Sequence, residues 1–236
     1  MKIAIMQPYI FPYIGYFQLI RAVDKFVVYD DVAFIKQGWI NRNNILLNGE
    51  RHLFSIPVEN LTSFKKINET RIAKNLYEKW VGKFARTLEM TYRKAPYFAD
   101  IYAPVLEVLE AGKNADSIAT LCREGIKMVT GYLGIDTTII DSSAGYGNDD
   151  LNAYQRVLDI CKKESAGVYI NAIGGQELYS RDVFQQHGIE LFFLQGNEIR
   201  YPQYKHEFVP HLSIIDLLMF NSRETVTQHI QNFNLV

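Results

Sequence analysis

The sequence predicts an α/β fold built on a parallel sheet, with an added β-hairpin and a helical insertion. Apolar runs of strand length alternate with stretches of helical spacing, and the runs centre near residues 2, 26, 138, 168 and 191. Such alternation is typical of parallel strands joined by crossover helices. We therefore expect one domain over 1–236, with a candidate helical subdomain at 76–132.

The N-terminal stretch opens this pattern. It indicates a strand at 2–6, a loop at 7–16 that contains two prolines and a glycine, a helix at 17–24 and a second strand at 25–31. Ligands of open α/β sheets bind at the carboxyl ends of strands, and helix N-termini favour anions. The loop at 7–16 is therefore the first place to expect a ligand.

The hairpin is predicted at 45–57, because Asn48-Gly49 separates two strand-like runs there. The segment 32–44 before it is expected to be a loop. After it, 58–74 is polar and irregular, with a small basic cluster at Lys65, Lys66 and Arg71. The elements expected beyond it are helices at 76–92, 97–111 and 115–132, a strand at 134–142, a Gly145/Gly147 loop, a helix at 150–164, a strand at 168–170, a turn at Gly174-Gly175, a helix at 180–186, a strand at 189–194 and one or two helices within 212–232.

Composition and charge restrict the partners of the protein. Hydrophobic residues make up 48% and charged residues 22% of the chain, as in folded globular proteins. Lys and Arg number 25 against 26 Asp and Glu, so no excess of positive charge favours nucleic acid. No apolar run is long enough for a signal segment or a membrane span, and Cys122 and Cys161 fall within predicted helices. We expect a cytoplasmic protein without membrane insertion, and the sequence leaves its oligomeric state open.

Two adjacent carboxylates stand at the end of the second predicted strand. Asp30 and Asp31 would lie beside the loop at 7–16, where they could hold Mg²⁺ or contact a sugar. Asp is equally common in turns at strand ends, so a capping role is the alternative.

The polar and aromatic segment at 32–44 supplies further candidates. Lys36 and Arg42 could neutralise a phosphate or carboxylate, Arg42 through its planar fork. Trp39, Asn41 and Asn43 could contact a sugar through a ring face and amides. A solvated shoulder of the hairpin would also be rich in Asn and Arg, and that alternative stays open.

Small and polar residues also follow the strand near 168. Asn171, Gly174, Gly175 and Tyr179 are expected on the ligand side of the sheet, since they come directly after a strand. A pair of glycines is by itself also what a simple turn requires.

The remaining motifs favour structural roles. Ser213 and Asp216 have the spacing of a helix N-cap, and an Asp buried there would need a partner. The five histidines form no metal-binding motif, and His206 and His211, five residues apart, are expected on a solvated surface. No metal site is predicted, and neither a serine-esterase elbow nor a P-loop occurs.

The loop at 7–16 resembles the signature of the nucleotidyltransferase superfamily. In that superfamily a His/Thr-x-Gly-His stretch follows the first strand and cradles nucleotide phosphates. Here Tyr13 stands at the first position, Gly15 at the glycine and Tyr16 at the final His, so the spacing is kept without the imidazoles. The resemblance implies a nucleotidyltransferase-like, Rossmann-like core in which the backbone near Gly15 approaches phosphate. The alternative is that these residues only shape a turn between strand and helix.

Separated blocks over nearly the whole chain resemble the WbqC-like family. They are Gln-Pro-x-x-x-Pro-x-x-Gly-Tyr-Phe from Gln7, Tyr29-Asp30-Asp31, Gly38-Trp-Ile-Asn-Arg-Asn43, Gly174-Gly175-x-x-Leu178-Tyr179, and Tyr201-x-Gln203 with Leu212-Ser-Ile-Ile-Asp216. The resemblance implies a role in bacterial O-antigen and other surface-polysaccharide gene clusters, often beside enzymes that make amino sugars. It places Gln7, Tyr201, Gln203 and Asp216 among the candidate binding residues.

The two resemblances imply an enzyme that acts on a nucleotide-linked amino sugar and a small-molecule substrate, by ATP-dependent N-acylation of the sugar amine. ATP with Mg²⁺ would activate a carboxylate. Lys36, Arg42 and the amides near Gly15 would neutralise phosphate charge. Asp30 or Asp31 would bind Mg²⁺ or orient the amine. The alternatives are a non-catalytic sugar-nucleotide binding or scaffold protein, and a transferase that uses a pre-activated donor.

Overall fold

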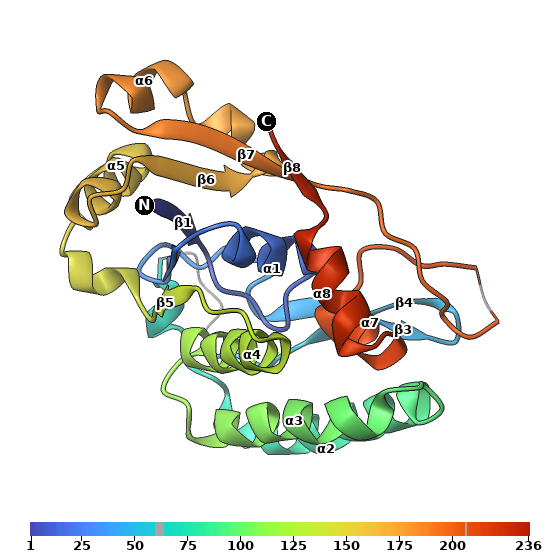
Figure 1. The fold of residues 1–236 in the computed structure, drawn as a ribbon. Coiled ribbons are helices and arrows are strands. Elements are labelled where there is room, and N and C mark those ends of the chain that lie inside the picture. The colour runs from blue at the N-terminus through green and yellow to red at the C-terminus, as the bar shows by residue number, and fades with distance from the viewer. Residues whose placement is uncertain (60–63, 206) are drawn as a thin grey trace.

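A six-stranded sheet forms the centre of the computed structural model, which describes residues 1–59, 64–205 and 207–236 (Figure 1). Within these residues the strand order is β5-β2-β1-β6-β7-β8. The first five described strands are parallel, whereas β8 pairs antiparallel with β7. The predicted α/β class and parallel sheet are confirmed. The sixth strand was not predicted.

The central strands are apolar because both faces of the sheet are covered. The strands of this sheet are β1 (Lys2–Met6), β2 (Lys25–Val28), β5 (Thr138–Ile140), β6 (Val168–Ala172), β7 (Glu190–Gly196) and β8 (Phe233–Leu235). In β1 and β2 successive residues face opposite sides and are still buried, which gives continuous apolar runs instead of alternation. The runs could therefore be recognised in the sequence.

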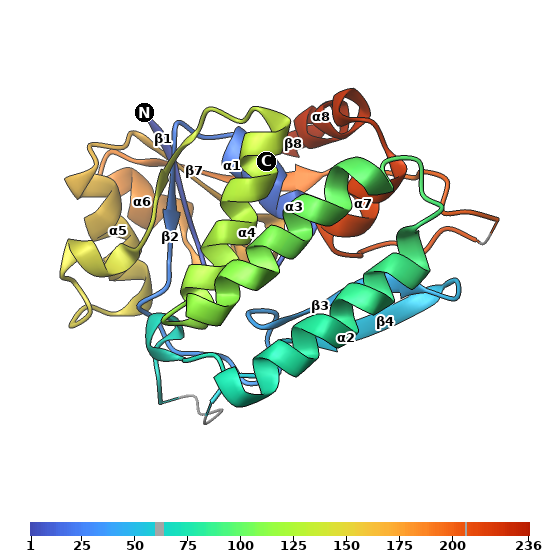
Figure 2. The same ribbon diagram turned by 90° about the horizontal axis from the view of Figure 1, so that it is seen from below.

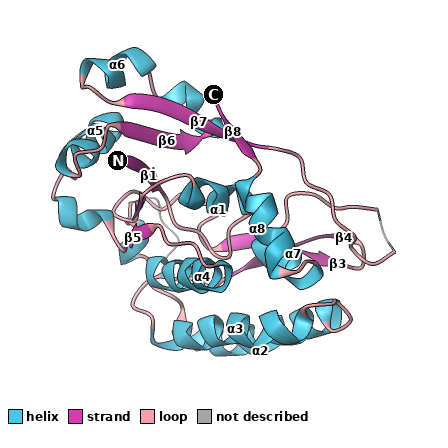
Figure 3. Ribbon diagram, in the orientation of Figure 1, coloured by secondary structure: helices cyan, strands magenta, loops and turns pink. Residues whose placement is uncertain are grey.

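Helices cover the two faces of the sheet separately (Figure 3). Helices α5 (Ala153–Lys163) and α6 (Arg181–Gln186) share one apolar cluster with Ile3, Ile5 and Tyr169. The opposite face packs against α1 (Ile14–Arg21), α4 (Ile118–Leu133), α7 (Ile214–Phe220) and α8 (Arg223–Gln231). The sheet thus forms the middle of three layers.

The predicted insertion is present as three helices, α2 (Lys74–Tyr92), α3 (Phe98–Ala111) and α4. Figure 2 shows α2 and α3 side by side, with α4 next to the sheet. Ser117 caps α4 by accepting a hydrogen bond from the backbone N–H of Thr120, and Gly134 ends it in the left-handed region at φ 65°. Apolar residues of all three helices belong to the same core as one face of the sheet. The division into a single domain stays a prediction.

The hairpin is confirmed, with corrected limits. Strands β3 (Arg42–Leu47) and β4 (Glu50–Ser55) are joined by Asn48 and Gly49, whose φ values of 54° and 80° suit a tight two-residue turn. The predicted loop at 32–44 is therefore too long, because Arg42 to Asn44 already pair with β4. Those polar residues form the first half of β3, which the sequence pattern began only at residue 45.

Short 3-10 helices replace several predicted loops and strand ends. They are η1 (Ile67–Glu69), η2 (Gly112–Asn114), η3 (Ser143–Tyr146) and η4 (Ile173–Leu178). The second strand ends at Val28 instead of residue 31, since Asp30 and Asp31 bond to η3 and not to a neighbouring strand. Residues 60–63 of the predicted irregular segment 58–74, and His206, lie outside the described residues.

The topology creates a crevice between β1 and β6. From β1 the chain passes through α1 to β2 on one side, and from β6 it passes through α6 to β7 on the other side. Connections that leave two adjacent parallel strands in opposite directions open a space at their carboxyl ends, where α/β proteins bind ligands.

Across the described ranges, no helix has both the length and the apolar composition needed to cross a membrane.

A buried carboxyl fixes the C-terminal helices against the insertion. Asp216 of α7 is fully buried and accepts hydrogen bonds from the Tyr92 hydroxyl at 2.8 Å, the Tyr201 hydroxyl at 2.7 Å and Nε2 of Gln203 at 2.6 Å. Burial raises the pKa of Asp216 to about 6, and these three donors oppose the rise. Ser213 caps α7, as predicted, by accepting from the backbone N–H of Ile215. The side chain of Asp216 finds buried partners instead of capping.

Asp216→Asn tests the charge state of this carboxyl. In the folded chain the pKa of Asp216 is about 6, whereas an unfolded Asp titrates near pH ~4. As pH rises, the carboxyl loses its proton in the unfolded chain before it does so in the folded chain. The contribution of Asp216 to the free energy of unfolding should therefore fall by about 3 kcal/mol between pH ~4 and ~6, and then level off. The Asn variant should lack this decline when urea unfolding is followed over that range.

The matched control is Asp136→Asn, which changes an exposed carboxyl. Its unfolding free energy should keep the pH dependence of the wild type. A difference between wild type and Asp216→Asn that stays constant with pH would contradict the raised pKa.

Candidate functional site

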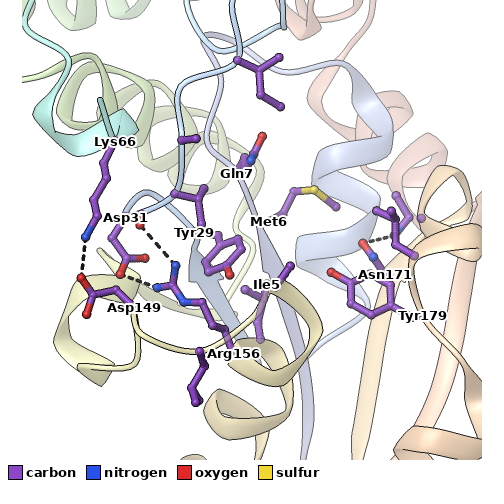
Figure 4. Close-up of a pocket in the computed structure, with 18 of the residues that line it drawn as sticks. Ile5, Met6, Gln7, Tyr29, Asp31, Lys66, Asp149, Arg156, Asn171 and Tyr179 are labelled. Atoms are coloured by element: carbon purple, nitrogen blue, oxygen red, sulfur yellow. Dashed lines mark hydrogen bonds and ion pairs between the residues drawn. The ribbon is translucent and has the colours of Figure 1, made fainter. Parts of the chain in front are cut away.

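A cleft of about 820 Å³ lies at the carboxyl ends of β1, β2 and β6 (Figure 4). Its size is within the range of small-molecule sites in proteins. Its lining includes Met6, Gln7, Tyr29, Asp31, Ile35, Phe64, Lys65, Lys66, Asp149, Leu151, Arg156, Asn171, Gly174, Gly175, Leu178 and Tyr179. The cleft therefore occupies the place that the strand topology predicts.

A buried ion pair forms one wall. Nη2 of Arg156 lies 2.5 Å from Oδ2 of Asp31, and Nη1 donates to the backbone oxygen of Asp31 at 3.3 Å. The Ser143 hydroxyl donates to Oδ1 of the same carboxylate, and Nε of Arg156 donates to Oδ1 of Asn148 at 3.2 Å. The guanidinium carbon stands 5.0 Å from the centre of the Tyr29 ring. Asp31 thus positions a cation in the cleft.

Arg156 was not among the residues predicted from the sequence. It lies in α5 four residues before Ile160, on the buried side of that helix. An arginine in an apolar stripe must find a buried acid, and that mismatch was the available signal. Its partner is 125 positions away in the chain, so spacing could not identify it.

Asp30 turns away from the cleft. Its Oδ1 accepts hydrogen bonds from the Ser142 hydroxyl at 2.7 Å and from the backbone N–H of Ser143 at 3.2 Å. Burial raises its pKa, although these two donors oppose the shift. Both carboxylates expected to bind Mg²⁺ or an amine are therefore engaged with η3 or α5.

Asn171 and Gly175 form a closely packed pair at the opposite wall. Oδ1 of Asn171 accepts from the backbone N–H of Ala172 at 2.8 Å, which leaves its Nδ2 without an acceptor in the described part of the chain. A Cβ atom on Gly175 would lie 2.5 Å from that Nδ2, while a Cβ on Gly174 would meet nothing within 4 Å. Gly175 is thus required for the position of the Asn171 amide.

Two tyrosines contribute hydroxyl donors. Tyr29 and Tyr179 are half-buried and line the cleft together with Gln7 (Figure 4). Burial raises the pKa of Tyr29 to about 12 and also raises that of Tyr179. Both hydroxyls are protonated at neutral pH and can donate to a ligand.

The charged side chains of the lining are unequal in number. Lys66 bonds to Asp149 at 2.8 Å, an ion pair that holds the pKa of Asp149 below its ordinary value. Arg156 pairs with Asp31. Within the described residues, Lys65 has no acid at ion-pair distance. The cleft therefore holds one cation more than its acids neutralise.

The loop at 7–16 is divided between two places. Gln7 lines the cleft, but Tyr13 lines a second cavity of about 310 Å³ together with Tyr201. Tyr16 is buried against the Phe26 ring, and Gly15 lies within α1 beside the Tyr13 ring. The residues that resemble the nucleotidyltransferase signature are thus not among those that line the larger cleft.

The candidates of the hairpin shoulder bond to backbone. Asn41 donates to the Ile56 carbonyl, and Nε of Arg42 donates to the Gly38 carbonyl while its guanidinium lies 5.6 Å from the Trp39 ring. Their side chains do not line the cleft.

Asn43 and Lys36 differ in burial but also lie outside the lining. Asn43 is buried and donates to the carbonyls of Ile10 and Phe11, so it holds the loop at 7–16 in place. Lys36 is exposed. Within the described ranges, no group of three His, Cys, Asp or Glu side chains is arranged to hold a metal ion.

Gly175→Ala should displace the Asn171 amide. Neither glycine has a positive φ, so alanine is conformationally permitted at both positions. The new methyl group at Gly175 should lower the free energy of unfolding by ~1–3 kcal/mol and shift the Asn171 side-chain amide signal in NMR spectra. Gly174→Ala, which adds the same atom to open space, should leave both nearly unchanged. Equal effects of the two variants would refute this packing role.

Comparisons with known proteins agree with the sequence resemblance. A relative named "Uncharacterized protein Rv1507c" from Mycobacterium tuberculosis (strain ATCC 25618 / H37Rv) is 31% identical over 219 residues, which is 92% of each chain. No solved structure matches. The sequence model of the WbqC-like protein family matches residues 7–228, a range that includes every polar side chain of the cleft described above. The chain belongs to the WbqC-like protein family.

Proposed function

We propose that this protein is an enzyme of bacterial surface-polysaccharide biosynthesis that binds a nucleotide-linked amino sugar in the cleft and acylates its amine. The observation that carries the proposal is the composition of the cleft lining. Amides, phenols and cations meet at the switch point of a parallel sheet, and these are the groups that bind sugar hydroxyls and phosphates.

The polar wall suits a sugar. Gln7 and Asn171 carry amides that can both donate and accept, as hydroxyl groups require. Tyr29 and Tyr179 add protonated hydroxyls and flat ring faces. Because Lys65 has no acidic partner among the described residues, its ammonium group is available to a phosphate.

Arg156 is the group best placed to stabilise negative charge that develops during acyl transfer. A guanidinium has five N–H groups, and the bonds to Asp31 and Asn148 use three of them. The other two have no acceptor among the described residues and remain for an oxygen of the ligand. The fixed orientation of the guanidinium means that little reorganisation is needed as charge builds.

The carboxylates predicted to hold Mg²⁺ do not fit that role. Asp31 is neutralised by Arg156, and Asp30 accepts from Ser142 and Ser143 outside the cleft lining. The proposed reaction therefore includes no step at a metal. The donor proposed first is a pre-activated acyl group, such as a thioester. The sugar nitrogen forms a bond to the acyl carbon, the bond from that carbon to the leaving group breaks, and the leaving group takes up the proton that the amine loses.

A non-catalytic sugar-nucleotide binding protein is the second candidate. It is favoured by the pairing of acids in the cleft, because Asp31 bonds to Arg156 and Asp149 bonds to Lys66. Both tyrosine hydroxyls are protonated and cannot serve as bases. Ligand binding without turnover would support this candidate.

The test is an acylation assay with mass spectrometry. The protein is incubated with nucleotide-linked 4-amino sugars and either acyl thioesters or ATP, Mg²⁺ and a panel of small acids that includes glycine. Amide formation with thioesters alone supports a pre-activated donor, whereas amide formation accompanied by AMP supports the ATP-dependent route. Absence of both product and binding over the panel would refute the proposal.

Arg156→Lys should lower kcat/KM about 100-fold in this assay, because lysine keeps the charge and loses the two available fork N–H groups. The control is Arg200→Lys, which alters an exposed arginine paired with Glu198 outside the cleft lining. Circular dichroism checks that both variants fold. Equal rates of the two variants would remove Arg156 from the reaction.

A further inference from the structure

Exposed apolar side chains line the outer part of the cleft beside the Lys66–Asp149 ion pair, whereas buried polar side chains line its inner wall. Leu178, Ile35 and Leu151 line it with exposed fractions of 70%, 52% and 37%. They come from η4, from the connection between β2 and β3, and from the connection between η3 and α5. Single exposed apolar residues are ordinary, but three from separate segments on one cleft indicate that part of the ligand is apolar.

Burial orders the lining by depth. Arg156, Asp31 and Asn171 are buried, Lys65 is half-buried, and Leu178 is largely exposed. From the buried end of the cleft outward, a bound ligand therefore contacts the Asn171 amide and the fixed guanidinium, then the lysine, and then aliphatic side chains. The groups of the ligand must change in the same order, from hydroxylated at its buried end to anionic and then apolar at its exposed end.

We infer that the nucleotide-linked sugar lies with its sugar inward, its diphosphate beside Lys65 and its nucleobase at the mouth against Leu178 and Ile35. This inference rests on the proposed function. In the reverse orientation the sugar hydroxyls would face Leu178 and Ile35, which offer no hydrogen bonds. The faces of a base are apolar, so they suit these aliphatic side chains.

The two lysines have different roles in this arrangement. Lys65 can meet a phosphate without losing an acidic partner among the described residues, whereas Lys66 must first leave Asp149. Lys65 is thus the residue that selects a diphosphate. Leu178 and Ile35 select a base over a second sugar.

Methyl NMR of the full chain tests the orientation directly. A bound base shifts nearby methyl signals through its ring current, and a hexose 1-phosphate has no ring of that kind. Titration with UDP, GDP, CDP, ADP and dTDP should move the methyl signals of Ile35 and Leu178 for at least one of these probes. Glucose 1-phosphate should not move them. The exposed Leu76 and Leu53, outside the cleft lining, are the internal controls.

Calorimetry with variants separates the lysine of the cleft from its exposed apolar part. Lys65→Gln should lower the affinity for inorganic diphosphate, and for the nucleoside diphosphate that binds in the titration, about tenfold. Loss of a charge-assisted hydrogen bond has an effect of this size. Lys79→Gln, at an exposed lysine of α2, should bind like the wild type. Leu178→Asn should weaken the nucleoside diphosphate about fivefold and leave inorganic diphosphate unchanged.

The outcomes distinguish this inference from the function on which it rests. If nucleotide-linked sugars are acylated but nucleoside diphosphates leave Ile35 and Leu178 unmoved and Leu178→Asn binds like the wild type, only the orientation is overturned. Movement of these methyl signals by an acyl thioester and not by nucleotides overturns it too. If no nucleotide or nucleotide-linked sugar binds, the orientation and the proposed function both fall.

Discussion

The buried ion pair between Asp31 and Arg156 is the interaction on which the architecture of the cleft depends. It joins the end of β2 to α5, two elements that are distant in the sequence and flank the same crevice. Removing two charges from water is costly, and such a pair is favourable only when its remaining hydrogen-bonding groups are also satisfied. Ser143 and Asn148 supply those bonds, so the guanidinium has one orientation.

This arrangement changes the meaning of the acidic motif. A carboxylate at a strand end can serve chemistry or structure, and its partners decide between them. Asp31 is neutralised by a cation that lines the cleft, and Asp30 is bonded to η3. The acids therefore act by fixing Arg156 and the neighbouring backbone. The hydrogen-bond donors that line the cleft suit the anionic ligand proposed above.

The sequence predicted what depends on local pattern and missed what depends on distant partners. Strands β1 and β2 could be recognised because burial on both faces makes them continuous apolar runs. The hairpin turn could be recognised because Asn48 and Gly49 tolerate positive φ. Strand β8 has only three residues, with Asn234 between two apolar residues, and only its pairing with β7 makes it a strand. Arg156 was missed because the helical spacing of apolar residues carries no information about a distant ion-pair partner.

The cleft itself was predicted in place but only partly in composition. Its position follows from topology, so Gln7, Asn171 and Tyr179 could be expected there. Spacing alone could not tell that Asn43 would bond to the loop at 7–16 and that Asp216 would enter the core. The blocks that resemble the family thus include residues that packing requires as well as residues that line the cleft.

The source of positive charge in the cleft differs from the one that the loop at 7–16 suggested. A helix N-terminus attracts anions through backbone N–H groups, but Tyr13 and Ile14 at the start of α1 line the second cavity. In the larger cleft the excess charge comes from side chains, since three cations and two acids are found among its described lining residues. A lysine is a flexible point charge, whereas backbone amides form a fixed cradle. Phosphate recognition by Lys65 would therefore tolerate some displacement of the phosphate. In the proposed reaction, Arg156, held by Asp31 and Asn148, would demand one position of the group that it contacts.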